Sequence, residues 1–301
     1  MAKLFNKTKT PSDARYPRGF AHMSSLAARG TGKSLMYLAL GIWAAIQIFP
    51  LFWMFTFSLK DNQEIFFYNP VGIPNEWRWE NYDEVINNAN MPTYFLNSVI
   101  VTVSTIAVVV VFGLMATYAL TRMVWRGRQI FRSYYILGLA IPIHAALLPI
   151  FFILRDMNML NTHWALILPY SAFGLSMSIM IFSGFIAGIP KELEESACLD
   201  GCNIFGIFFR IILPLMKPAI SVVSIFTFLQ CWNELLFAST YATDWRYRTL
   251  TVGIMEMQGQ FRTEWGPIGA GLSIATLPVL VFYVVLSKKV QQSLVIGAVK
   301  G

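Results

Sequence analysis

The chain has 301 residues, of which 56% are hydrophobic and 13% are charged, and its net charge is +7. A soluble domain carries about a quarter of charged residues, so this composition excludes an ordinary soluble protein. Basic residues gather in the cytoplasmic loops of membrane proteins, so the positive charge does not call for a nucleic-acid partner. The three cysteines, Cys198, Cys202 and Cys231, match neither a disulfide framework nor a paired C-x-x-C zinc pattern.

The first 34 residues are polar and basic, and without an early apolar core we expect no signal peptide there. The sequence GTGKS at 30–34 resembles a phosphate-binding loop, but Ala27 stands where that loop requires glycine, and no strand precedes it. We therefore interpret residues 1–34 as a basic cytoplasmic segment and expect no ATPase site in this chain.

Six apolar segments follow, and each is long enough to cross a membrane as a helix. They are residues 35–59, 95–120, 133–154, 163–187, 211–240 and 265–287. Lys217 and Pro218 interrupt the fifth, so its membrane-crossing part is expected to begin near Pro218. Prolines inside the other segments are tolerated where neighbouring groups satisfy the freed carbonyls; they are Pro142, Pro149, Pro169 and Pro278. The sequence thus predicts an all-α membrane protein with six transmembrane helices.

The distribution of Lys and Arg over alternate loops predicts the orientation of the chain. One side holds seven in the N-terminal segment, four in 121–132, two in 188–210 and three in the tail 288–301, sixteen in all. The other side holds six. Because the basic side is cytoplasmic, both termini and the 188–210 loop are predicted to lie in the cytoplasm.

The opposite loop, residues 60–94, carries six acids and a group of aromatic residues. The aromatic residues are Phe66, Phe67, Tyr68, Trp77, Trp79 and Tyr82. The loop is long enough to form a cap on the periplasmic face, and an interfacial aromatic belt explains the same residues equally well.

The loop 188–210 reads as two short helices joined by a glycine turn. Pro190 suits the start of the first helix, and the acids that follow it suit its first turns. Asp200 and Gly201 end this helix, since Gly201 suits a left-handed position. The second helix carries Phe205, Ile207, Phe208, Ile211 and Ile212. Leu213 and Pro214 mark a bend toward the membrane. Such a loop either docks on a partner or caps the bundle as a solvated amphipathic segment.

The spacing of small and apolar residues in this loop resembles a known motif. Glu195, Ser196, Ala197, Gly201, nine further residues, then Ile211, Leu213 and Pro214 match the EAA motif of the membrane subunits of binding-protein-dependent ABC importers. Serine replaces the usual alanine at 196, and both are small. Five further matches resemble MalG-like permeases of sugar importers: Asn97-Ser98, Gly184-Phe185, Ile189-Pro190, Trp232-Asn233-Glu234 and GAVKG at 297–301. The likeness runs from about residue 35 to the end.

The resemblance implies the type I ABC importer permease fold, with residues 95–287 as its core, in the bacterial inner membrane. In that family the motif forms a coupling helix that docks on a cytoplasmic ATPase, which binds the ATP and Mg²⁺. The implied coupling residues are Glu195, Ser196, Ala197, Asp200, Gly201, Ile211, Leu213 and Pro214. Besides membrane lipid, the implied partners are a MalF-like second permease, two ATPase copies and a periplasmic sugar-binding protein. The 288–301 tail either reaches the ATPase pair or is an unstructured end.

Polar residues recur in the fifth apolar segment at spacings that keep them on one helical face. They are Ser221, Ser224, Thr227, Gln230, Asn233 and Glu234. Intramembrane polar residues are often functional, and an amide and hydroxyl stripe suits a neutral sugar, so Thr227, Gln230, Asn233 and Glu234 are candidates for the solute pathway. Hydrogen bonding between helices is the alternative. We expect Gly266, Gly269, Gly271 and Ser273 to serve packing, and His144 and His163 to be packed or interfacial.

Two other functions remain open at this point. The first is an ABC importer for a non-sugar solute, and only GAVKG at 297–301 and the Trp232-Asn233-Glu234 triplet argue against it. A self-contained secondary transporter or receptor is disfavoured, because ion-coupled carriers place acids or broken helices at mid-membrane, whereas Lys217 and Glu234 lie near segment ends.

Overall fold

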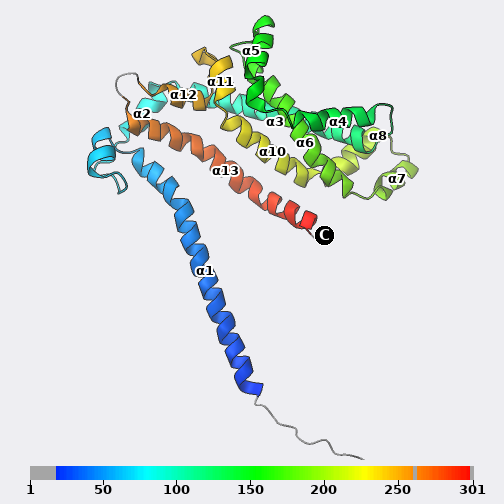
Figure 1. The fold of residues 1–301 in the computed structure, drawn as a ribbon, viewed down its shortest axis with the longest axis horizontal. Coiled ribbons are helices and arrows are strands. Elements are labelled where there is room, and N and C mark those ends of the chain that lie inside the picture. The colour runs from blue at the N-terminus through cyan, green and yellow to red at the C-terminus, as the bar shows by residue number, and fades with distance from the viewer. Residues whose placement is uncertain (1–17, 260–262, 299–301) are drawn as a thin grey trace, which may run out of the picture. The chain divides into compact units, whose positions relative to one another are not determined.

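The computed structural model describes residues 18–259 and 263–298, with side chains placed for residues 33–259 and 263–285. Within these ranges every regular element is a helix, which confirms the predicted all-α fold (Figure 1). The chain divides into two compact units after Trp53. The first unit contains most of α1 (Arg18–Phe57), so part of the predicted 1–34 segment is helical, and the rest of that segment lies outside the described residues.

Among the residues that the structure describes, four uninterrupted stretches are long and apolar enough to cross a membrane. They are Lys33–Phe57 within α1, α3 (Met91–Thr121), α6 (Trp164–Ala187) and Trp265–Val285 within α13 (Trp265–Ala298). Two bent helix pairs pass the same test, which gives six spans if each pair counts as one. Because α13 continues as a helix to Ala298, most of the predicted 288–301 tail is helical.

The third apolar segment is not the single continuous helix that we expected. It consists of α4 (Arg128–Gly138), η2 (Ile143–Ala146) and α5 (Leu147–Asp156). The chain bends by 96° between α4 and the stretch formed by η2 and α5. The break lies at Pro142, whose backbone is extended, with φ −62° and ψ 119°. Proline has no N–H to donate, and it disfavours helical geometry in the residue before it. In contrast, Pro169 and Pro278 remain inside α6 and α13.

The fifth apolar segment is also broken into shorter pieces. They are α8 (Ile204–Ile207), the π-helix η3 (Phe208–Ile212), α9 (Leu213–Leu215), α10 (Lys217–Trp232) and α11 (Leu236–Tyr241). The long helix starts next to Pro218, as predicted. The 70° bend falls between Leu215 and Lys217, so the predicted bend at Leu213 and Pro214 is wrong. Pro214 stands where the π-helix η3 passes directly into α9, and the backbone of Ile212 and Leu213 before it is helical.

In the second unit α3 packs along α6 and α10, and α10 packs along α13 (Figure 1). Glycines allow the closest approach between α3 and α6. A Cβ atom on Gly113 would lie 2.4 Å from the hydroxyl of Ser178, and one on Gly174 would lie 2.8 Å from Val109. Gly266 likewise allows α13 to approach the backbone of Lys60 closely, because a Cβ atom on Gly266 would lie 2.4 Å from the Lys60 carbonyl oxygen. The packing role predicted for the glycines of α13 fits this geometry.

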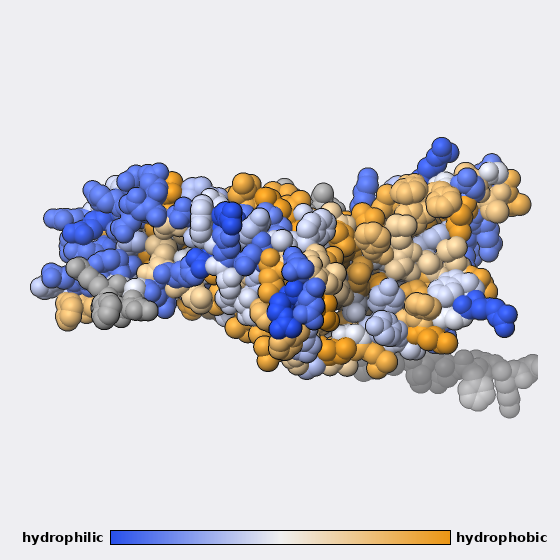
Figure 2. Space-filling model, turned by 90° about the horizontal axis from the view of Figure 1, so that it is seen from above, coloured by the Kyte–Doolittle hydropathy of each residue, from blue (hydrophilic) through white to orange (hydrophobic). Residues whose placement is uncertain are grey.

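The loop between the first two spans is folded, as a cap requires, and most of its aromatic side chains are exposed, which also fits the interfacial belt. It contains η1 (Glu64–Tyr68) and α2 (Glu80–Asn87). Lys60 is fully buried, and its Nζ donates to the carbonyls of Asn69 and Gly72 at 2.6 and 2.7 Å. Burial lowers the pKa of this lysine. Figure 2 shows hydrophilic residues gathered at the end of the core that carries this cap.

Candidate functional site

The segment from α7 (Glu192–Leu199) to the start of α10 forms two arms joined by a tight turn, and we call residues 190–216 the elbow. Gly201 has φ +82°, the left-handed conformation that the sequence predicted. The N–H of Cys202 donates to the carbonyl of Ala197 at 2.9 Å, and the N–H of Gly201 donates to that of Cys198 at 3.0 Å. This pair of bonds is the Schellman motif, which closes the helix end without a side-chain cap.

The second arm begins directly after this turn. Asn203 has an extended backbone, and its Oδ1 accepts from the N–H of Gly206 at 2.8 Å. This side-chain cap satisfies an N–H that the first turn of α8 leaves without a helical partner. Only Asp200 to Asn203 therefore separate the two arms, and each end of the turn is fixed by hydrogen bonds.

The elbow is fastened to the membrane helices by a large apolar cluster. Its buried members from α3, α6 and α10 are Val109, Leu114, Tyr118, Phe182, Ile186, Ala219 and Val223. Its buried members from the elbow are Ala197, Ile207, Phe208, Ile212 and Met216. Ile211 and Leu213 pack against the same cluster, whereas Pro214 is exposed. The apolar end of the predicted motif thus holds the second arm against the spans.

A buried ion pair adds a polar fastening between the elbow and α3. Nε of Arg122 lies 3.0 Å from Oε1 of Glu194, with only 9% and 14% of the two side chains exposed. Nη2 of Arg122 also donates to the carbonyls of Ile186 and Ile189. The hydroxyl of Tyr118 donates to Oε2 of Glu194 at 3.2 Å. Arg122 therefore joins the ends of two spans to the first arm.

Sequence reasoning missed this pair. Arg122 was counted only for its charge, and Glu194 only as an acid in the first turns of a helix. The sequence signal for this pair is weak, because Glu194 is one of four acids in its loop and Arg122 is one of four arginines in residues 121–132.

The small residues of the motif face in different directions. Glu195, Ser196 and Asp200 are exposed, and the side chain of Leu199 is 90% exposed. Ala197 is only 7% exposed and packs against the cluster. Its small side chain brings α7 close to its own bundle, so the outward face of the elbow is formed by its exposed neighbours.

The predicted solute stripe on α10 divides into buried and exposed residues. Thr227 is 5% exposed, whereas Gln230 and Asn233 are exposed. A hollow beside Thr227 and Gln230, next to Gly174 of α6, has a volume of about 10 Å³. That is about the room that a single water molecule needs. This hollow is too small for a sugar.

Glu234 is held within its own chain. Tyr170 donates its hydroxyl to Oε2 of Glu234 at 2.5 Å. The N–H groups of Phe237 and Ala238 donate to the same carboxylate at 2.9 and 3.1 Å. Two of these donors belong to the first turn of α11 and the third lies on α6, so Glu234 caps α11 and joins it to α6. Glu234 therefore has a structural role among the four candidates.

The remaining residues that carried the resemblance also make internal contacts. Nδ2 of Asn97 donates to the carbonyls of Arg246 and Arg248 at 2.8 and 2.9 Å, and its Oδ1 lies 2.9 Å from Nε2 of His163. The hydroxyl of Ser98 accepts from the N–H at the start of α12 (Leu250–Glu256). These bonds fix the loop before α12, with η4 (Trp245–Tyr247), to the N-terminal part of α3. The half-buried His163 also has its ring 5.3 Å from that of Tyr247, so it is packed within the chain, one of the two alternatives expected for it.

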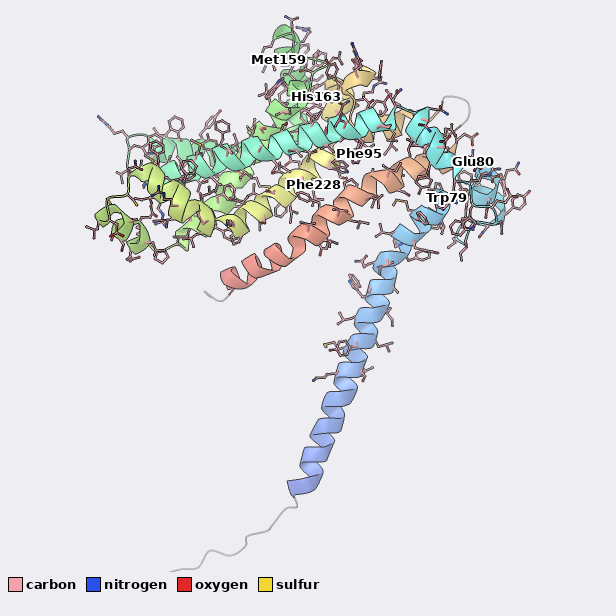
Figure 3. All side chains as sticks on the ribbon, turned by 180° about the vertical axis from the view of Figure 1, so that it is seen from behind. Trp79, Glu80, Phe95, Met159, His163 and Phe228 are labelled. Carbon is pink, nitrogen blue, oxygen red and sulfur yellow. The ribbon has the colours of Figure 1, made fainter. Side chains whose placement is uncertain are left out.

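Trp232 is buried rather than available to a solute. Its Nε1 donates to the carbonyl of Ala275 at 3.0 Å. The centroid of its ring lies 5.7 Å from that of Phe95 and 5.4 Å from that of Phe228. Figure 3 labels Phe95 on α3 and Phe228 on α10. It joins α3, α10 and α13, so the Trp-Asn-Glu triplet combines two structural residues with the exposed Asn233.

Comparison with known proteins places these features in a family. The family model of binding-protein-dependent transport system inner membrane components matches residues 109–294. The probable ABC transporter permease protein YurM of Bacillus subtilis is 34% identical, over 90% of this chain and 89% of its own. The diacetylchitobiose uptake system permease protein NgcG of Streptomyces coelicolor is 33% identical, over 86% of each.

Two further similarities extend the comparison. The trehalose/maltose transport system permease protein MalG of Thermococcus litoralis is 30% identical, over 89% of this chain and 97% of its own. A chain in the crystal structure of a bacterial ABC transporter involved in the import of the acidic polysaccharide alginate has a TM-score of 0.74 at 20% identity. It covers 93% of this chain and 99% of its own, so the fold is shared along nearly the whole length.

Proposed function

The chain belongs to the family of binding-protein-dependent transport system inner membrane components, and from this premise we propose that it is the permease subunit of an ATP-driven sugar importer. It is a multi-pass membrane protein and not an enzyme by its family. The single observation that carries the proposal is the elbow, which is fastened to three spans and turns an exposed face outward. A bacterial inner membrane is the location that fits this family.

The elbow transmits movement from separate ATPase subunits to the spans. To transmit movement, the elbow must be held rigidly against the spans, and the buried cluster and the Arg122–Glu194 pair provide this rigid attachment. The elbow must also present a surface to the ATPase, and Glu195, Ser196 and Leu199 are exposed for docking. ATP and Mg²⁺ are bound by the partner ATPases in this proposal.

We infer that the transported solute is a sugar from the names of two relatives. NgcG is named for diacetylchitobiose uptake and MalG for trehalose and maltose transport. Exposed amide groups on Gln230 and Asn233 suit a neutral solute with many hydroxyl groups. A second permease subunit, facing α10, completes the pathway, and a periplasmic sugar-binding protein delivers the solute to the capped side.

Replacing Leu199 by Ala tests the docking face. Burying a leucine side chain stabilises an interface by about 1.5–3 kcal/mol, so ATPase binding is expected to weaken about tenfold or more. The measurement is titration of the purified permease pair with the ATPase. Leu236→Ala is the matched control, because Leu236 is 49% exposed on α11 outside the elbow. Unchanged ATPase binding by Leu199→Ala would contradict docking at the elbow, and uptake into proteoliposomes without ATP would contradict the whole proposal.

Replacing Gln230 or Asn233 by Leu tests the solute pathway. The loss of one hydrogen bond to a solute hydroxyl costs about 1 kcal/mol, so each variant should take up sugar about fivefold less well at limiting concentration. ATPase binding should stay normal, because neither residue belongs to the elbow. Ser239→Ala is the control, since its hydroxyl is bonded to the carbonyl of Leu236. Normal uptake by both leucine variants would assign these residues to packing.

A further inference from the structure

An apolar groove is formed by the end of α3 and the second arm of the elbow. It has a volume of about 240 Å³. Its lining residues are Met115, Tyr118, Ala119, Met123, Ile204, Phe205, Phe208 and Phe209. Tyr118 and Phe208 are buried below it, with ring centroids 5.3 Å apart. Phe205 and Phe209 are 68% and 58% exposed.

The chemistry of this groove selects an apolar occupant. The only polar side chain in the lining is Tyr118, and its hydroxyl is already directed to Glu194. A peptide strand laid in the groove would bury backbone N–H and carbonyl groups without partners, at a cost of about 1–3 kcal/mol for each. A hydrocarbon chain has no such groups, and each CH₂ buried contributes about 0.8 kcal/mol.

The groove lies where a membrane span ends. Trp125 follows α3, and its Nε1 donates to the carbonyl of Ala119 in the groove wall at 3.0 Å. Tryptophan is the residue that gathers at the membrane–water interface. Exposed phenylalanines on a short segment that meets the next span at 70° fit an element lying in the plane of that interface.

Arginines without a carboxylate partner lie on the two chain segments that form the groove, directly after α3 and within the second arm. Nη1 of Arg128 donates to the carbonyl of Met123 at 3.2 Å, which holds this guanidinium at the rim. Arg210 directly follows Phe209 and is exposed, as is Arg126. In the part of the chain with placed side chains, the ion pairs involve other arginines, and no carboxylate neutralises these three. Arg122 nearby is occupied by Glu194.

We propose that this groove binds an anionic phospholipid, with one acyl chain between Ala119 and Phe209 and the headgroup phosphate at Arg128 and Arg210. The lipid would fill the space between α3 and the second arm and so brace the elbow on its outer side. Clusters of arginine beside the end of a span provide the charge that recognises such a headgroup. This inference does not depend on the proposed function, since it rests on the groove and its charges alone.

The test is native mass spectrometry of the intact purified complex, exchanged into equal amounts of phosphatidylglycerol and phosphatidylcholine. We expect preferential retention of phosphatidylglycerol. Arg128→Gln with Arg210→Gln should reduce that preference, by about fivefold for each charge removed. Ala119→Phe, which fills the groove, should abolish retention of the bound lipid. Arg155→Gln is the matched control, because Arg155 is an exposed arginine in the last turn of α5, paired with Asp156.

Several results would overturn this inference. Equal retention of both lipids would mean a site without headgroup recognition. Full displacement of the lipid by soluble glycerol phosphate would leave an anion site in which the groove takes no part. Dissociation of the complex on Ala119→Phe would assign the groove to a protein partner. Undiminished retention in the double arginine variant, which changes only solvent-accessible side chains, would remove the role of the charges. ATPase binding, measured on the same samples, reports on the proposed function separately.

Discussion

Replacing Arg122 by Gln is expected to destabilise the elbow by about 3–5 kcal/mol, the cost of leaving a buried charge without its partner. The substitution leaves Glu194 unpaired and removes the donor to the carbonyls of Ile186 and Ile189. The elbow should then separate from the end of α3, and ATP hydrolysis should continue without uptake. The measurement is the ratio of sugar imported to ATP hydrolysed in proteoliposomes, together with protease sensitivity of the elbow.

A graded pair of variants distinguishes this fastening from a general effect of charge. The Glu194→Gln variant should lose less coupling than Arg122→Gln. A glutamine carbonyl still accepts from Tyr118, and Arg122 stays bonded to the two backbone carbonyls. Arg126→Gln is the control, since Arg126 is exposed four residues away on the same side. Equal loss of coupling in all three variants would show that total positive charge matters rather than the buried pair.

Replacing Gly201 by Val is expected to have the second large effect. Its φ of +82° costs an L-residue roughly 1–2 kcal/mol, and β-branched side chains suffer most. A Cβ atom there meets no other atom within 4 Å, so the cost comes from the backbone and not from a clash. A penalty of about 1.4 kcal/mol on the docked geometry lowers coupled transport about tenfold.

The backbone origin of this effect can be tested by residue type. Gly201→Asn should retain more coupling than Gly201→Val, because asparagine tolerates the left-handed conformation. Gly184→Ala is the matched control, since a Cβ atom there is also free of neighbours and its φ is not positive. A valine variant with normal coupling would show that the Schellman turn is not needed for transmission.

Local signals made much of the elbow predictable. The glycine that ends α7 and the helix formers before it act over a few residues, so the turn at Gly201 could be predicted from the sequence. Ala197 could not be oriented in this way, because the side of α7 that faces the bundle depends on packing against Ile207 and Phe208. The Arg122–Glu194 pair depends on where α3 ends relative to a loop far along the chain.

The roles of proline and acidic residues in the apolar segments could not be predicted either, because they too depend on neighbours that only the folded chain brings together. Pro142 breaks a helix, whereas Pro169 continues one, and their neighbours in three dimensions decide the difference. Glu234 looks functional in a linear reading because an acid near a membrane is rare. Its carboxylate accepts from Tyr170 and from the start of α11, which only the folded chain brings together.

The most direct test of the account is a distance measurement between spin labels, with and without trapped ATP, in the assembled complex. One label pair lies within this chain, at Glu192→Cys at the start of α7 and Val124→Cys beyond α3, in a variant whose exposed native Cys198 is replaced by Ser. Glu192 and Val124 are both exposed, and Glu192 is not one of the residues proposed to dock on the ATPase. A second pair joins residue 192 to the corresponding loop of the second permease. The account predicts that the first distance stays constant while the second changes with nucleotide. A first distance that changes while the second stays fixed would show a flexible loop, and would contradict a lever rigidly joined to its spans.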